Sequence, residues 1–411
     1  MRKMYTCIDI GTDKIKAVTI EYYNDKFNVL ATASCDSKGV KKGLIVDAGA
    51  VTSAIKKTVK ELESKLGTKI TQVLAVVPSN NRSINIGEAE VKITKEDHLI
   101  TGDNIFTCMN KCIKGNVAPD HEVVSVLPIE YKIDGGKKVK NPLGLEGNVL
   151  SMKSVIISVP KKNVYSVVGI LENVGLEVVD ITISSIADYY SIKDNELDSH
   201  VVAIVDIGKE KEVLSVFNKG ILIKEKIVAE GSKDIDATIG FNYKTDEAMS
   251  KKIKEEYGVA NRKYADSDET YKVTNKLDGT SEVNQYSLSE IIEQKLTGIL
   301  KNAKNDLNDL TNREISYIIV TGAVTSMLGF DGLVSDVYGN KGQVLNLNVI
   351  GLRDGGYSAC YGSIKYFVSK LELREKEYTM LADEKVDEML KARKKLGSGS
   401  ALGKIFGKIF E

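Results

Sequence analysis

The chain has 411 residues, a length that suggests two to four domains at about 150 residues each. Its 57 basic and 57 acidic residues cancel, which argues against a nucleic-acid binder that depends on a broad basic surface. Hydrophobic residues make up 42% of the chain, so wholesale disorder is excluded, and no apolar run is long enough to span a membrane.

The first third of the chain alternates strands and helices. Residues 5–10 and 15–22 predict two strands joined by a glycine-containing turn. Asp47 is a candidate N-cap for a helix that Gly67 ends, and the short apolar run 72–77 is typical of a buried parallel strand. No cleavable apolar leader precedes the first strand, which predicts a cytoplasmic protein.

From about residue 82 the pattern changes. Thr94 and Asp97 resemble a capping box that opens a helix toward Ile113. Residues 123–127 and 129–133 predict strands, followed by a glycine turn and a polar stretch. Strands with turns and one helix indicate a small inserted α+β domain over about 82–160.

The remaining residues return to an α/β pattern. Strands are expected at 177–183, 201–205, 213–217, 221–228 and 315–321, with a hairpin around Asp278 and Gly279. Helices are expected at 161–174, 288–310, 358–369 and 384–395, the last followed by a Gly/Ser linker.

The five cysteines are odd in number and scattered, so a disulfide framework is not expected. Cys108 and Cys112 are four residues apart and share a helix face. Because no histidine lies near them in sequence, we expect two small buried side chains rather than a metal site.

An internal repeat organises the chain. Residues 6–11 (TCIDIG) and 203–208 (AIVDIG) are the same phrase, a buried strand ending in Asp-Ile-Gly. Two such hairpins facing one another would clamp a nucleotide, because turn N–H groups donate to phosphate oxygens and glycine leaves room for the phosphate. An aspartate at each strand end can hold Mg²⁺ through water. The alternative is two unrelated strands that end alike.

With this repeat, the chain resembles the actin/Hsp70/sugar-kinase superfamily and, within it, the bacterial cell-division family FtsA. The resemblance implies an α/β, actin-like two-lobed fold made of duplicated ribonuclease H-like domains, and an ATP site with magnesium. The nucleotide-binding residues implied are Asp9, Gly11, Thr12, Asp13, Lys14, Asp206, Gly208, Lys209, Gly231, Glu293, Gly322 and Ala323. Asp9 and Asp206 would hold the magnesium through water, and no catalytic residue is assigned.

Phrases outside the loops are more specific to FtsA. Residues 41–47 (KKGLIVD) look like the family's phrase before its first helix, and residues 127–131 (LPIEY) with 141–145 (NPLGL) resemble its extra subdomain, 1C. The subdomains implied are 1A at 1–81, 161–198 and about 365–380, 1C at 82–160, 2A at 199–230 and 311–364, and 2B at 231–310. A charged linker at 381–400 and an amphipathic helix at 401–411 would follow.

The loops also depart from the family pattern. Gly208 is followed by Lys209, Glu210, Lys211 and Glu212, where the family has glycines, threonines and a second aspartate. Either glutamate would repel a triphosphate unless it points outward, while a lysine partly replaces a lost donor. Asp13 stands where serine is usual, and Ala323 replaces a glycine. We expect weakened ATP binding and little hydrolysis, because hydrolysis tolerates little misplacement.

The last residues predict a membrane-targeting helix that lies in the interface. Large apolar side chains recur on one helix face and lysines take the other. The membrane-binding residues are Leu402, Lys404, Ile405, Phe406, Lys408, Ile409 and Phe410. The alternative is a helix packed on the protein's own body. Because a short helix gains little on burial, stable attachment would need many linked copies.

By this resemblance the chain is a peripheral protein at the cytoplasmic face of the plasma membrane, at the division site. It would polymerise like actin and bind the C-terminal tail of the tubulin-like protein FtsZ on subdomain 2B, where Lys244, Lys251, Lys252 and Arg262 are candidate contacts. The alternatives are an active ATPase of the superfamily and a pilus-assembly adaptor like PilM.

Overall fold

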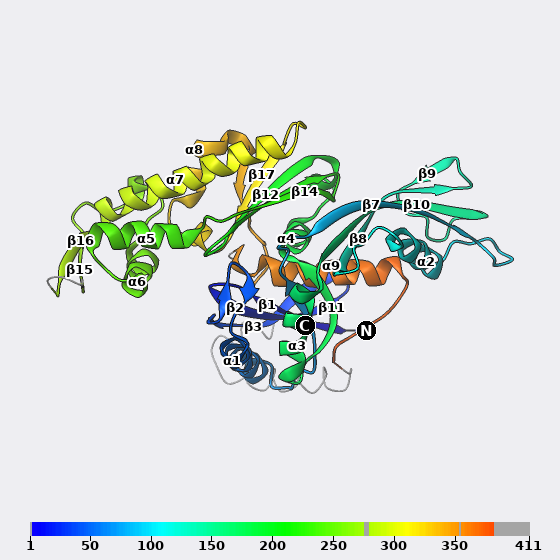
Figure 1. Ribbon diagram of the computed structural model, residues 1–411, viewed down its shortest axis with the longest axis horizontal. Helices are drawn as coiled ribbons and strands as arrows, with labels where there is room; N and C mark the ends of the chain where they lie inside the picture. Colours follow the sequence, from blue (N-terminus) through cyan, green and yellow to red (C-terminus); the bar gives the residue numbers. More distant parts are fainter. Residues whose placement is uncertain (1, 275–278, 353–354, 382–411) are drawn as a thin grey trace.

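A computed structural model describes residues 2–274, 279–352 and 355–381. Two lobes lie one above the other, and a third sheet projects to one side (Figure 1). The linker and the amphipathic helix expected beyond residue 381, with all seven membrane-binding candidates, lie outside the described residues. No helix in the described part is long and apolar enough to cross a bilayer.

The first lobe is built on a mixed sheet with the strand order β11-β6-β1-β2-β3. Its strands are β1 (Lys3–Ile10), β2 (Lys14–Tyr23), β3 (Lys26–Asp36), β6 (Gln72–Val77) and β11 (Glu177–Ile183). β1 pairs antiparallel with β2 and parallel with β6, because a tight turn joins the first pair and a helix joins the second. These strands confirm the expected ones.

Helices cover both faces of this sheet. In Figure 1, α1 (Ala48–Leu66) and α3 (Lys161–Asn173) lie below it, whereas α4 (Ser184–Ile192) and α9 (Ser358–Leu373) lie between the two lobes. The predicted caps of α1 are confirmed: the Asp47 carboxylate accepts from the N–H of Ala50, and Gly67 adopts the left-handed conformation.

The second lobe repeats the first. Its sheet has the order β14-β13-β12-β17-β18, with β12 antiparallel to β13 and parallel to β17. Its strands are β12 (Val201–Ile207), β13 (Glu212–Asn218), β14 (Ile221–Val228), β17 (Tyr317–Thr321) and β18 (Gly342–Val344). The same directions and connections occur twice, which confirms the duplication inferred from the repeat.

Helices and a hairpin complete this lobe. They are α5 (Ser232–Tyr243), α6 (Glu247–Tyr257), α7 (Gln285–Leu310), α8 (Phe330–Tyr338), β15 (Thr270–Val273) and β16 (Ser281–Asn284). β15 and β16 pair antiparallel, as the expected hairpin requires, although Asp278 itself lies outside the described residues. One apolar core joins α7 and α8 to the sheet.

The third sheet has the order β7-β10-β8-β9 and packs on α2 (Gly102–Ile113). Its strands are β7 (Ser83–Lys92), β8 (His121–Ile133), β9 (Lys137–Val139) and β10 (Val149–Pro160). The two strands expected at 123–127 and 129–133 are one strand, β8, with a bulge beside Pro128.

The predicted start of α2 was wrong. The helix begins after Thr101, whose hydroxyl accepts from the N–H of Asn104 while the Asn104 side chain accepts from the N–H of Thr101. Thr94 and Asp97, which the sequence suggested as a capping box, lie before the helix, and the Asp97 carboxylate accepts from the N–H of Leu99 instead. Cys108 and Cys112 are fully buried on this helix, as expected, and their thiols donate to main-chain carbonyls.

The two central helices approach closely at one glycine. A Cβ on Gly362 of α9 would lie 1.7 Å from the carbonyl oxygen of Ala187 on α4. Only glycine permits this contact. The α4–α9 pair belongs to an apolar core cluster that contains β1 and β6 of the first lobe and part of β12 of the second. The two helices therefore pack against both lobes.

Candidate functional site

The two Asp-Ile-Gly phrases form turns of the same geometry. The N–H of Gly11 donates to the carbonyl oxygen of Lys14 at 3.1 Å, and the N–H of Gly208 donates to that of Lys211 at 3.0 Å. In each turn a Cβ on the glycine would lie 2.8 Å from the same carbonyl oxygen, so the turn requires glycine. The structure therefore brings the two halves of the repeat together as a matched pair of loops.

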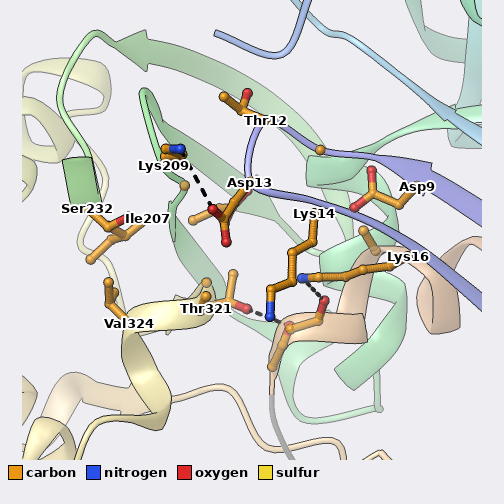
Figure 2. A pocket seen from close by; sticks show the side chains of 18 of the residues that line it. Asp9, Thr12, Asp13, Lys14, Lys16, Ile207, Lys209, Ser232, Thr321 and Val324 are labelled. Atoms are coloured by element: carbon orange, nitrogen blue, oxygen red, sulfur yellow. Dashed lines mark hydrogen bonds and ion pairs between the residues drawn. The ribbon is translucent and has the colours of Figure 1, made fainter. Parts of the chain in front are cut away.

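Both loops open into one cleft between the lobes, with a volume of about 710 Å³. This is the size of a pocket for a small-molecule cofactor. The predicted site residues that line it are Asp9, Gly11, Thr12, Asp13, Lys14, Asp206, Gly208, Lys209, Gly322 and Ala323. Figure 2 shows side chains of the first loop and of Lys209 reaching into this space from opposite sides.

Carboxylates and lysines alternate on the floor of the cleft. Asp9 ends β1, Asp206 lies near the end of β12, and Asp188 comes from α4. Burial raises the pKa of Asp9, and the Lys16 and Lys211 ammonium groups offset part of that rise. The pKa of Asp188 is also raised. Burial is the largest cause, and the negative charge of the Asp206 carboxylate is the second. The charges of Asp206 and Asp9 thus affect the pKa of Asp188.

The second loop turns its lysines inward and its glutamates outward. Lys209 and Lys211 line the cleft. Glu210 accepts from the N–H of Lys42 at 2.9 Å, in the hairpin β4 (Val40–Lys41) and β5 (Leu44–Ile45), and also pairs with Lys233. Glu212 is 1% exposed inside the second lobe. Neither glutamate lines the cleft, so both point away from a ligand there, which is one of the two possibilities left open by the sequence. The loop presents the positive charges of its lysines to the cleft.

Ion pairs cross the cleft mouth. The Lys251 ammonium of α6 lies 2.6 Å from the Asp13 carboxylate. Lys209 lies 3.9 Å from the same carboxylate, and Figure 2 shows this contact as a dashed line. Burial alone would raise the pKa of Asp13, but the hydrogen bond and charge of Lys251 lower it overall. The first loop is therefore connected to the second lobe through a charged side chain rather than a hydroxyl.

The far wall of the cleft begins where β17 ends. Gly322 has φ 111° and lies so close to β12 that a Cβ would be 2.3 Å from the carbonyl oxygen of Ile207. Ala323 and Val324 follow in a short 3₁₀ turn, Ala323–Ser326. Gly355 and Tyr357 line the same side, before α9. The glycine is required here by both conformation and space.

Two predicted site residues do not line the cleft. Gly231 packs behind the second loop, where a Cβ would lie 2.6 Å from the carbonyl oxygen of Gly208. Glu293 lies on α7, and its carboxylate accepts from the N–H of Arg262. Conversely, Lys251, named from the sequence as a candidate partner-binding residue of the second lobe, lies in the cleft. Helix periodicity alone could not show which face α6 and α7 turn toward the loops.

Sequence reasoning missed Asp188, Lys16 and Ser358, all of which line the cleft. Ser358 donates to the Asp188 carboxylate at 2.6 Å, and Lys16 donates to the carbonyl of Gly356. The signal for Asp188 was available in the sequence, since it is a lone carboxylate within the apolar helix SSIADYYSI. An acid on a buried helix face needs a partner or a ligand.

The cleft residues suit a polyphosphate better than a magnesium ion. The lining contains six carboxylates together with six lysines, which can pair with phosphate oxygens: Lys14, Lys16, Lys209, Lys211, Lys251 and Lys254. Among the described residues, no group of three or more acidic, histidine or cysteine side chains is placed to hold a metal. Asp9 and Asp206, the predicted magnesium residues, both line the cleft, and the charge of Lys211 acts on both carboxylates.

Comparisons with known proteins agree with this architecture. The family model described as "SHS2 domain inserted in FTSA" matches residues 81–158, and the model "Cell division protein FtsA" matches residues 203–362. Together they match more than half of the chain. The cell-division protein FtsA of Enterococcus hirae is 26% identical over 379 residues, covering 90% of this chain and 84% of that protein. The Bacillus subtilis FtsA is 26% identical over 368 residues, covering 89% and 83%.

Solved structures show the same fold at low identity. The PilM–PilN type IV pilus biogenesis complex matches with a TM-score of 0.58 at 14% identity, covering 90% of this chain and 98% of that one. MreB5 of Spiroplasma citri bound to ADP matches with a TM-score of 0.53 at 12% identity, with the same coverage. The expected actin-like fold with an inserted small domain is confirmed. The chain belongs to the FtsA family of cell-division proteins.

Proposed function

We propose that this chain tethers FtsZ polymers to the inner face of the plasma membrane and helps to assemble the division ring there. The observation that carries the proposal is the sheet β7-β10-β8-β9, inserted between β6 and α3, which coincides with the FtsA insert model. An actin-like fold alone hosts filaments, enzymes and adaptors, so the fold would not decide among these roles. The subdomain limits expected from the sequence remain part of the proposal.

The FtsZ tail would bind to the part of the second lobe formed by residues 231–310. Of the four candidate cations there, Lys251 pairs with Asp13 in the cleft and Arg262 pairs with Glu290. Lys244 and Lys252 are exposed, and Lys244 lies over the ring of Phe241, which is 75% exposed. An exposed aromatic beside lysines suits an acidic peptide with apolar side chains.

Fluorescence anisotropy with a labelled FtsZ tail peptide tests this step. We expect saturable binding that the charge reversals Lys244→Glu and Lys252→Glu weaken together. The matched control is Lys60→Glu, on an exposed position of α1 in the other lobe, which should bind as the wild type does. Equal weakening by the control, or no binding by the wild type, contradicts the proposal. Binding of a pilus inner-membrane protein in place of the FtsZ tail would favour the PilM-like alternative.

Attachment to the membrane would come from residues 402–410. Five apolar side chains on one face and two lysines give a helix that lies in the headgroup region. Weak attachment per copy suits a protein that polymerises, since linked copies bind through avidity. In vesicle flotation we expect Phe406→Glu to lose association with anionic vesicles while its circular dichroism stays unchanged. Flotation of that variant with the vesicles would contradict the assignment.

The cleft would hold ATP, with slow hydrolysis or none. Support comes from the paired glycine turns, the six lysines that line the cleft and the volume of the cleft. The hydroxyl and carboxylate side chains of the family's second loop are replaced by Lys209, Glu210 and Lys211, so we assign no catalytic residue. Isothermal titration with ATP and a phosphate-release assay separate binding from turnover. Robust turnover would favour the alternative of an active ATPase.

A further inference from the structure

Lys211 of the second loop extends across the cleft to the opposite lobe. Its ammonium group donates to the side-chain carbonyl of Asn80 at 3.2 Å. It also packs on Gly43, where a Cβ would lie 2.6 Å from the nitrogen, so the missing side chain makes room for the lysine. The ammonium is thus held by both lobes in a defined place, unlike an exposed lysine.

The carboxylates around this ammonium leave it with two main counter-charges. Asp206, Glu225 and Asp9 all act on Lys211 and oppose the effect of burial, which lowers its pKa. Both oxygens of Glu225 are already engaged, by Arg82 at 2.9 Å and by the hydroxyl of Ser185 at 2.5 Å. The Asp9 and Asp206 carboxylates, which line the same cleft, therefore remain as its counter-charges, and these are the residues that would otherwise hold a hydrated magnesium ion.

In nucleotide sites that use magnesium, the metal neutralises the phosphate oxygens. A divalent ion held by Asp9 and Asp206 would share the cleft with the Lys211 ammonium, whose charge acts on both carboxylates, and would be repelled by it. The corresponding residue of the first loop, Lys14, also lines the cleft, and Lys209 is held only by long ion pairs of 3.8 and 3.9 Å. The second loop thus presents two positively charged side chains, Lys209 and Lys211, to a ligand in the cleft.

We propose that Lys211, supported by Lys209, replaces the magnesium ion, so that the cleft binds the metal-free polyphosphate of ATP. The inference rests on the nucleotide site proposed above and names the form of the ligand that the site takes.

Isothermal titration of the full chain with ATP, in excess EDTA and in excess magnesium chloride, tests the proposal. We expect the wild type to bind ATP in EDTA with an affinity within about threefold of that in magnesium, or tighter. Binding that magnesium strengthens about tenfold or more overturns the inference but leaves the nucleotide site intact. No binding in either buffer overturns the nucleotide site itself, and this inference with it.

Lys211→Met adds a second, independent readout. We expect this variant to bind ATP about tenfold or more weakly in EDTA, because a charged hydrogen-bond donor to the phosphates is lost, and to regain affinity when magnesium is added. The control is Lys224→Met, an exposed lysine of the same sheet on β14, which should match the wild type in both buffers. Wild-type affinity of Lys211→Met in EDTA would overturn the role of this lysine. If that variant does not fold, the wild-type comparison still decides.

Discussion

Gly11 and Gly208 open turns that have the same hydrogen bond, yet the side chains that follow them differ in charge and direction. In the first loop Thr12 accepts from the N–H of Gly43, and Asp13 turns into the cleft. In the second loop Lys209 turns into the cleft, and Glu210 turns away from it. The strand pairing on either side imposes the backbone of both turns, whereas no core packing restricts their side chains. Duplication has therefore preserved the geometry while the chemistry diverged.

The largest expected effect concerns the strand ends that adjoin the two loops. Gly322 follows β17, and the equivalent position after Val76 in the first lobe holds Val77. Gly322→Ala should destabilise the protein by about 4 kcal/mol or more, because the new Cβ would meet a main-chain oxygen in a left-handed conformation. Urea unfolding measures this loss.

The control for that substitution is Gly339→Ala, at φ 65° with open space around it. It carries only the conformational cost of a backbone region that is largely restricted to glycine, about 1–3 kcal/mol. If the two variants lose the same free energy of unfolding, the close approach of Gly322 to Ile207 adds nothing to the cost of the Gly322 substitution.

The second prediction concerns Glu212, whose repeat-related position in the first lobe is the buried Ile15. Burial raises the pKa of Glu212 from 4.5 to about 8, with smaller contributions from Glu230 and Asp206. The carboxyl therefore destabilises the folded protein least below pH 4.5, where it is protonated in both the folded and the unfolded chain. It destabilises the folded protein more as the pH rises toward 8. Glu212→Gln should be more stable than the wild type at pH 9 by up to roughly 4 kcal/mol, and this gain should shrink at pH 4.5.

Thermal unfolding across this pH range measures the gain. Glu314→Gln is the control, because Glu314 is exposed, pairs with Lys341 at 3.0 Å and is not among the groups that shift the pKa of Glu212, so its removal should not produce the same pH-dependent gain. A stability difference for Glu212→Gln that does not change with pH would contradict the buried, protonated carboxyl.

A third test compares the two turns directly. Gly11→Ala and Gly208→Ala place a Cβ at the same 2.8 Å from a carbonyl oxygen, so each should cost about 1–3 kcal/mol, and the two costs should agree. Urea unfolding of both variants gives the comparison. Unequal losses, well beyond experimental error, would mean that the two turns are not equivalent in energy.

The smallest effect separates the two acidic residues at equivalent loop positions. Asp13→Asn removes a negative charge that faces the cleft and releases Lys251, so ATP affinity should rise several-fold, about 1 kcal/mol. Glu210→Gln should leave affinity nearly unchanged, because that carboxylate faces the hairpin at Lys42. Isothermal titration distinguishes the two, and weaker binding by Asp13→Asn would contradict the electrostatic role given to Asp13.

Much of the fold could be predicted from local patterns. Asp47 and Gly67 marked the ends of α1 correctly because caps act within one helical turn. The start of α2 was misplaced because two pairs with capping-box spacing, Thr94 with Asp97 and Thr101 with Asn104, follow one another in the sequence. Only the second pair forms the reciprocal hydrogen bonds. The bulge in β8 was read as a break for a similar reason, since proline interrupts strands as well as ends them.

The sequence by itself determined the duplication and the two glycine turns, because these depend on local phrases that recur at the same place in each half, whereas the cleft residues were expected from the resemblance to the FtsA family. Tertiary structure decided which charges meet. Lys211 with Asn80, Lys251 with Asp13 and Ser358 with Asp188 join residues more than one hundred positions apart. Helix periodicity fixes which residues share a face, but the packing of whole lobes sets where that face points, and the electrostatics of the cleft depend on those directions.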